Sequence, residues 1–209
     1  MHLKKQIMFL RNIAHFQLIS ILYDYINKDV GFYVDIGAFD GIKNSKTLLF
    51  EKKGWGGLCI EPQPTSFKKL EKNRSCEKKN LLISYYNGYS DFFYSEKAPM
   101  TSRVSLEGVT KRIHRMDDVK KLNIKCCKLN CLCKELKIST IDFLKLDTEG
   151  HDAKIINSLD FAELNISVIM YEQWVRQEEK EYKNAEIKLA RSGYKLIHYN
   201  QENKIWSKI

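Results

Sequence analysis

The sequence lacks the features that mark membrane proteins, low-complexity linkers and disulfide-rich secreted domains. No apolar run approaches the roughly 18 residues that a membrane span requires. Only three prolines occur in 209 residues, and no internal repeat is visible. The six cysteines do not form the paired C-x2-C knuckles of structural zinc sites, so reduced and packed thiols are the better interpretation. We therefore expect one globular domain with no membrane span.

A concentrated block of one charge is also missing. Lysine and arginine number 35 against 26 acidic residues, for a net charge of +9, but no run of five or six basic residues occurs. Nucleic-acid-binding proteins usually gather their basic residues on one face, so a nucleic-acid partner is disfavoured. The positive balance still leaves room for an acidic partner such as a phosphorylated sugar or an anionic glycan.

The first 29 residues differ in pattern from the rest of the chain. Lysines precede apolar residues, as in a signal peptide, but Arg11, Asn12, His15 and Gln17 interrupt any apolar core. Apolar residues recur there at steps of three and four, which predicts an amphipathic helical segment packed on a domain formed by residues 30–209. We expect a cytoplasmic protein, and the sequence leaves its oligomeric state open.

From residue 30 onward, short apolar runs alternate with helical stretches. This alternation predicts an α/β fold, in which a parallel sheet with right-handed crossovers has helices on both faces. The predicted helices are 45–53, a helix beginning at Pro64, 153–159 and 182–191, and the predicted strands are 31–36, 58–61, 81–85, 141–146, 166–171, 194–199 and 204–206. Residues from about 90 to 137 fit this rhythm poorly, which predicts an insertion that forms a lid or a ligand-binding region.

Four of the predicted strands run into a carboxylate, namely Asp35, Glu61, Asp147 and Glu172. Ligands of open α/β sheets bind beyond the carboxyl ends of the strands, so these residues are the informative ones. The glycine-rich turn at 37–41 lets a ligand approach the backbone, and an acid after the second strand can bind a ribose. Together these features predict a nucleoside site.

The turn itself indicates which nucleoside. It reads D-I-G-A-F-D-G and lacks the G-x-G-x-x-G spacing of dinucleotide-binding folds. Asp35, just ahead of the turn, would repel a pyrophosphate and attract a cation. S-adenosylmethionine carries a sulfonium and an ammonium group, so it suits a negative pocket better than a dinucleotide does.

A second acidic cluster lies in IDFLKLDTEGHD, residues 141–152. Asp147, Glu149 and His151 crowd into five residues where a predicted strand ends and a helix begins. The simpler interpretation is that Thr148 or Asp152 caps the helix and that the acids favour its positive end. The number of acids exceeds what capping requires, which favours a functional site.

The segments DIGAFDG, GWGGLCIEP, IDFLKLDTEGHD and YEQ, in this order and spacing, resemble the FkbM family of S-adenosylmethionine-dependent methyltransferases. The resemblance covers about residues 30–175. It implies a Rossmann-like class I methyltransferase fold, with a mostly parallel seven-stranded sheet and a final antiparallel strand. It also implies O-methylation of a hydroxyl on a sugar, glycan or other small molecule.

The resemblance assigns cofactor residues by position. Asp35, Gly37 and Gly41 would hold the methionine moiety, and Glu61 would hold the ribose, while Ile83 and Ser84 would lie near the adenine. The remaining residues expected at S-adenosylmethionine are Ala38, Phe39, Pro62 and Asp147.

An alcohol needs activation to accept a methyl group, by a base or by a metal ion. The catalytic candidates are Asp147, Glu149, His151 and Glu172, with His151 as a direct base that Asp147 or Glu149 orients. Alternatively, Asp147, Glu172 and the amide of Gln173 form an all-oxygen set that would suit Mg²⁺. Two other functions stay open, an RNA methyltransferase acting on a 2′-hydroxyl or a base, and a non-catalytic module that binds S-adenosylmethionine.

Overall fold

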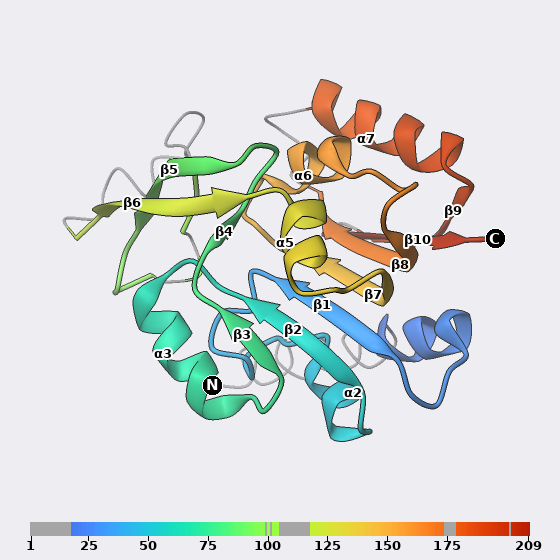
Figure 1. Ribbon diagram of the computed structural model, residues 1–209, viewed down its shortest axis with the longest axis horizontal. Coiled ribbons are helices and arrows are strands. Elements are labelled where there is room, and N and C mark those ends of the chain that lie inside the picture. The colour runs from blue at the N-terminus through green and yellow to red at the C-terminus, as the bar shows by residue number, and fades with distance from the viewer. Residues whose placement is uncertain (1–17, 99, 101, 105–117, 174–178, 201) are drawn as a thin grey trace, which may run out of the picture.

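The computed structural model describes residues 18–98, 100, 102–104, 118–173, 179–200 and 202–209. Its centre is a seven-stranded sheet of order β3-β2-β1-β7-β8-β10-β9 (Figure 1). Every pairing is parallel except those of β10, which runs antiparallel to β8 and β9. These strands are β1 (Phe32–Ile36), β2 (Gly56–Ile60), β3 (Glu77–Lys79), β7 (Thr140–Leu146), β8 (Asn165–Glu172), β9 (Tyr194–Tyr199) and β10 (Asn203–Lys208). The expected sheet is therefore confirmed, including its antiparallel strand.

Helices cover both faces of this sheet, and each face has its own core. One core lies beneath α5 (Leu129–Glu135), α6 (Asp152–Ser158) and α7 (Glu179–Arg191). The opposite core lies beneath α2 (Leu48–Lys52), α3 (Pro64–Asn73) and the helical residues 18–26. Successive strand residues alternate between the two cores, as the pleat requires, so both faces of the central strands are apolar.

A second, three-stranded sheet lies beside the carboxyl ends of β1 and β2 (Figure 1). It consists of β4 (Leu82–Ile83), β5 (Gly88–Tyr94) and β6 (Lys120–Cys127), in the order β4-β6-β5. Strand β4 pairs with β6 in parallel, and β5 pairs with β6 antiparallel. Most of this sheet comes from the stretch whose pattern did not fit the main repeat.

The prediction of a third main-sheet strand at 81–85 was wrong. The main sheet uses β3 instead, and Leu82–Ile83 belong to the second sheet. The side chain of Asn80 donates hydrogen bonds to the carbonyls of Glu61 and Pro62, at 2.8 and 3.1 Å. These bonds tie the chain to the turn after β2, and the strand that follows pairs with β6 rather than with β2.

Several local predictions can be checked directly. Pro64 begins its helix at the first position, and Gly54 follows α2 with a φ of +90°. Helix α2 is shorter than the expected 45–53, because the hydroxyl of Ser45 accepts a hydrogen bond from the N–H of Leu48 and the helix begins there. Within the described part of the chain, no helix has the length and apolar character to cross a membrane.

Candidate active site

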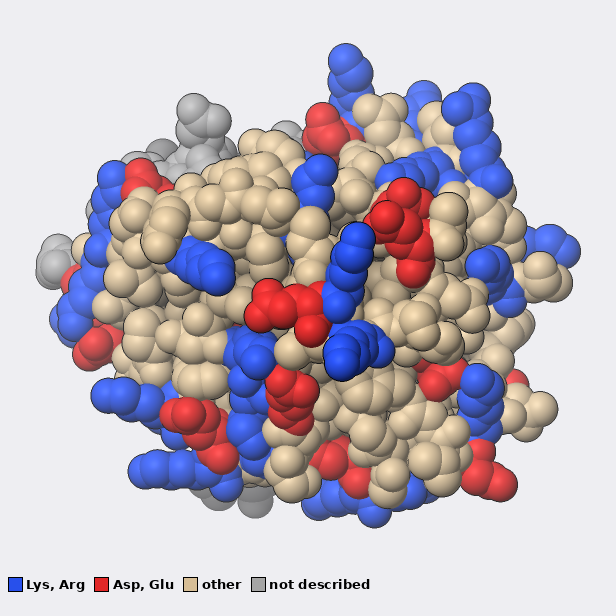
Figure 2. Space-filling model, in the orientation of Figure 1, with Lys and Arg blue, Asp and Glu red and all other residues tan. Residues whose placement is uncertain are grey.

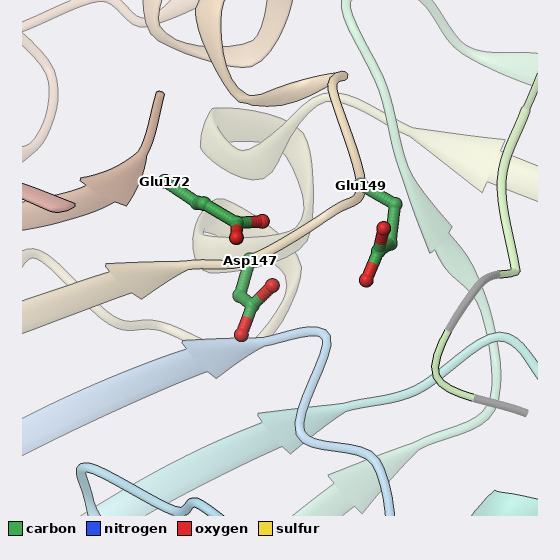
Figure 3. Close-up of side chains that lie close together, drawn as sticks. All are labelled: Asp147, Glu149 and Glu172. Atoms are coloured by element: carbon green, nitrogen blue, oxygen red, sulfur yellow. The ribbon is translucent and has the colours of Figure 1, made fainter. Parts of the chain in front are cut away.

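Three neighbouring strands bring the predicted carboxylates to one edge of the main sheet. Strand β7 lies between β1 and β8, and the N–H of Asp147 donates to the carbonyl of Ile36 at 3.1 Å, so these strand ends are level. One carboxylate oxygen of each of Asp147, Glu149 and Glu172 lies within 4.8 Å of the others (Figure 3). The order of the strands and their register therefore bring these three acids together.

A cavity that is partly open to solvent lies beside this cluster. Its walls are the turn after β1, the end of β2, Asp147 and Glu149 of the acidic cluster, and apolar side chains of the second sheet, whereas Glu172 does not line it. The residues expected at the cofactor that line it are Gly37, Phe39, Glu61, Pro62, Ile83 and Asp147. The others, which do not line it, are Asp35, Ala38, Gly41 and Ser84.

Glu61 is held rigidly at the edge of this cavity. It is 6% exposed, and its two oxygens accept hydrogen bonds from the backbone N–H groups of Phe39 and Gln63, each at 2.8 Å. Burial raises the pKa of Glu61 to about 7, although both N–H groups act in the opposite direction. Each carboxylate oxygen retains a second lone pair, so Glu61 can still accept hydrogen bonds from a pair of hydroxyls.

The two glycines of the turn have different roles. Gly37 has a φ of +78°, and a Cβ there would lie 2.0 Å from the carbonyl oxygen of Asp147. Only glycine therefore lets the turn approach the end of β7. At Gly41, also with a φ of +78°, a Cβ would meet Arg74 and Leu70 at 2.5 and 2.7 Å, so this glycine serves packing against α3.

Asp35 is buried behind the cavity and paired within the protein. The hydroxyl of Thr47 donates to it at 2.6 Å, and the ammonium of Lys145 lies 3.1 Å from its other oxygen. The same ammonium donates to the carbonyl of Gly37 at 2.9 Å and lies 3.4 Å from Asp147. Sequence reasoning missed Lys145, although a lysine inside the apolar run of FLKLD was a visible signal.

Glu149 sits in a strained backbone conformation on the cavity wall. Its φ is +56°, which is unusual for a residue with a side chain and recurs at functional sites. Burial, with the nearby charges of Glu172 and Asp147, raises its pKa to about 8. Arg103, a second residue that sequence reasoning missed, lies 3.6 Å from its carboxylate.

His151 does not line the cavity. It is 7% exposed, its Nε2 lies 3.2 Å from the hydroxyl of Ser84, and its ring packs against Tyr85. Burial, with the charge of Lys154, lowers its pKa to about 4. The imidazole is therefore neutral near pH 7, with one nitrogen already engaged.

The simpler interpretation of the acidic turn holds only in part: Asp152 lies in the first turn of α6, but the expected side-chain cap is not formed. The residue before α6 is His151, which makes no side-chain cap hydrogen bond. Asp152 instead accepts hydrogen bonds from the N–H and the hydroxyl of Thr148, at 3.0 and 2.6 Å. Gln173, proposed for a metal, follows β8, where its N–H donates to the carbonyl of Glu202.

Comparisons with solved structures support this fold. The structure of magnesium protoporphyrin IX methyltransferase from Synechocystis PCC 6803 with bound SAM aligns with 98% of this chain and 83% of its own, at a TM-score of 0.52 and 8% identity. The METTL16 MTase domain aligns over 92% of this chain and 66% of its own, at a TM-score of 0.51 and 13% identity. No curated protein sequence matches the chain.

A family model provides the more specific relationship. The model described as the methyltransferase FkbM domain matches residues 35–196, which extend from the end of β1 into β9. This range includes the glycine turn, the acid after β2 and the whole acidic cluster. Because the match covers most of the chain, the protein belongs to the FkbM family of S-adenosylmethionine-dependent methyltransferases.

Proposed function

We propose that this methyltransferase transfers a methyl group to a hydroxyl of a sugar or glycan. The observation that carries the proposal is the cluster of Asp147, Glu149 and Glu172, of which Asp147 and Glu149 line the cavity beside Glu61. A carboxylate cluster can remove a proton from a hydroxyl and can also accept hydrogen bonds from neighbouring hydroxyls of the same sugar.

The cavity suits S-adenosylmethionine in shape and charge. Glu61 offers paired acceptors for a ribose, and the glycine turn lines the cavity at Gly37. Apolar residues such as Ile83 provide a wall for an adenine. The cofactor supplies a methyl group activated by a positively charged sulfur, and Asp147 and Glu149 would place negative charge near that sulfur.

Among the candidate bases, we favour Glu149. It lines the cavity, and a pKa raised to about 8 brings its proton affinity closer to that of a hydroxyl than an ordinary carboxylate has. Asp147 and Glu172 would hold the acceptor hydroxyl against it. His151 is less suitable, because its side chain contacts Ser84 and Tyr85 rather than the cavity.

A divalent cation is the alternative means of activation. Asp147, Glu149 and Glu172 offer oxygen ligands close enough to hold Mg²⁺, which would make a bound hydroxyl more acidic. Two protein cations already face these acids, Lys145 at Asp147 and Arg103 at Glu149. We therefore favour the base. If EDTA leaves the rate unchanged and added Mg²⁺ does not raise it, a metal has no part in the reaction.

A sugar acceptor fits the surroundings better than RNA. Tyr85, before β5, and Tyr89, within it, are 47% and 68% exposed and can stack on a sugar face. On the face shown in Figure 2, lysine and arginine side chains are interspersed with acidic ones rather than gathered into one basic stripe. RNA-binding surfaces usually carry such a stripe.

The test is to incubate the protein with S-adenosylmethionine labelled in its methyl group and to follow transfer to nucleotide sugars, oligosaccharides and RNA. Label on a sugar oxygen supports the proposal, and label on RNA replaces it with the RNA alternative. Binding of S-adenosylhomocysteine without transfer to any acceptor would favour a non-catalytic module. Asp147→Asn serves as the inactive control for each acceptor.

A further inference from the structure

Lys145 is a charged residue inside the main sheet. It lies on β7 between Leu144 and Leu146, both at most 1% exposed, and is itself 5% exposed. A buried ammonium is unfavourable unless strong acceptors surround it. Burial would lower the pKa of Lys145, but Asp35 and Asp147 together raise it above its ordinary value. The residue is therefore a permanent cation beneath the candidate active site.

The ammonium contacts three groups, one in β1, one in the turn after β1 and one directly after β7. It donates to the carbonyl of Gly37 at 2.9 Å and lies 3.1 Å from Asp35 and 3.4 Å from Asp147. An ammonium has three N–H groups, so these three oxygens can use all of them. Lys145 thus links the glycine turn after β1 to the carboxylate that follows β7.

Asp35 is the buried carboxylate that pairs with this ammonium behind the cavity. Its second oxygen accepts a hydrogen bond from Thr47 at 2.6 Å, and the hydroxyl of Thr47 accepts one from Arg74 at 3.1 Å. Arg74 in turn pairs with Glu51 on α2, at 2.6 Å. This buried chain of polar contacts surrounds Asp35 behind the cavity, which it does not line.

We propose that Lys145 is a positioning residue, whose ammonium holds the turn at Gly37 in the geometry that binds the cofactor and the carboxylate of Asp147 in the geometry that serves methyl transfer. Asp35 is its counterion and acts through it, without touching the ligand. This inference deepens the proposed function, because Asp147 is placed there beside the reacting groups. Repulsion within the acidic cluster would otherwise turn Asp147 away from Glu149 and Glu172, which lie within 4.8 Å of it.

A purely structural role is the competing explanation, in which Lys145 and Asp35 only form a buried ion pair. Lys145→Met removes the charge and keeps much of the length. We expect about a tenfold weaker affinity for S-adenosylhomocysteine, from the loss of one charge-assisted hydrogen bond to the turn, and a lower Tm. Where an acceptor is known, we expect kcat to fall about 10²-fold, as for a misplaced catalytic group.

The double variant Asp35→Asn, Lys145→Met separates the two explanations. It removes both buried charges, so the Tm should recover relative to Lys145→Met. The affinity for S-adenosylhomocysteine, measured by calorimetry, should stay low. Asp35→Asn alone should lose less affinity than Lys145→Met. Lys188→Met is the matched control, since Lys188 donates to the carbonyls of Asn157 and Leu159 away from the cavity.

Recovery of affinity together with Tm in the double variant would overturn the inference, as would equal losses in Asp35→Asn and Lys145→Met. If Lys145→Met does not fold, the double variant compared with Asp35→Asn decides the question. The calorimetry needs no acceptor. A failure to find a methylated hydroxyl would therefore count against the proposed function alone.

Discussion

Replacing Asp152 by asparagine should stabilise the protein near neutral pH, although Asp152 is fully buried within the acidic turn. Its oxygen Oδ1 accepts both hydrogen bonds from Thr148, and Oδ2 has no hydrogen-bond partner among the described residues. Burial, with the charges of Asp147 and Glu172, raises the pKa of Asp152 to about 8. Asparagine keeps the oxygen that Thr148 needs and replaces the unpartnered oxygen with a neutral NH₂ group.

The size of the effect follows from linkage between protonation and folding. In the unfolded chain Asp152 loses its proton near its ordinary pKa of 3.8, whereas in the folded chain it keeps the proton to about pH 8. Between these values ionisation favours the unfolded state, so the free energy of unfolding falls as pH rises. Each pH unit within this interval lowers the free energy of unfolding by about 1.4 kcal/mol. At pH 7 the ionisation of Asp152 therefore destabilises the folded protein by roughly 4 kcal/mol.

Urea unfolding of the wild type and Asp152→Asn at pH 5, 6, 7 and 8 measures this difference. Near pH 5 the two free energies of unfolding should be closest, because the folded wild type then carries a protonated and neutral side chain. The gap should widen steadily to pH 8, with the variant the more stable. A wild type that is more stable than Asp152→Asn at pH 8 would refute the assignment of a buried, uncompensated carboxylate.

Three further predictions concern the cavity. Glu61→Ala should weaken the affinity for S-adenosylhomocysteine, measured by calorimetry, by about tenfold or more. The reason is that each lost hydrogen bond to a charged group is worth roughly 1.5–3 kcal/mol. Unchanged affinity would remove Glu61 from the ribose site. Asp147→Asn should abolish turnover and leave that affinity within a few-fold, and comparable turnover would exclude Asp147 from the reaction. S-adenosylmethionine, which is cationic at sulfur, should release more protons on binding at pH 7 than S-adenosylhomocysteine does, because a positive charge lowers the raised pKa values of Glu61 and Glu149. Calorimetry in buffers of different ionisation enthalpy checks this, and equal proton release would contradict a direct approach of the cation to these acids.

The main sheet could be predicted because its signals are local. Strands β1 and β7, of five and seven residues, are largely apolar, with Asp35 near the end of β1 and Asp147 directly after β7. Pro64 and Gly54 mark helix ends. The family resemblance then implied the fold, and the observed strand order places Asp147 beside Glu172, as the predicted set of oxygen ligands requires. Position within the sheet was therefore sufficient to find the acidic cluster.

The failures have a different origin, since they depend on contacts between distant residues. Nothing local distinguishes β3 from β4, and the break between them depends on Asn80 reaching back to the carbonyls of Glu61 and Pro62. The sequence also did not show that Asp35 faces Lys145, because their pairing is a register between β1 and β7. Such contacts depend on the assembled fold.

The raised pKa values also explain how an acidic site can receive a cation and then release a neutral product. Near pH 7, Glu149 and Asp152 are protonated most of the time. The positive charges of Lys145 and Arg103 offset those of the neighbouring acids. Before the cofactor binds, this acidic region therefore carries less negative charge than its composition implies. A positive sulfur at the cavity favours the ionised carboxylates, and their charge then stabilises it. Methyl transfer leaves that sulfur neutral, so the carboxylates regain protons and the attraction weakens. In the proposed function, the burial that destabilises the folded chain would thus also make the charge of these carboxylates follow the charge of the bound ligand.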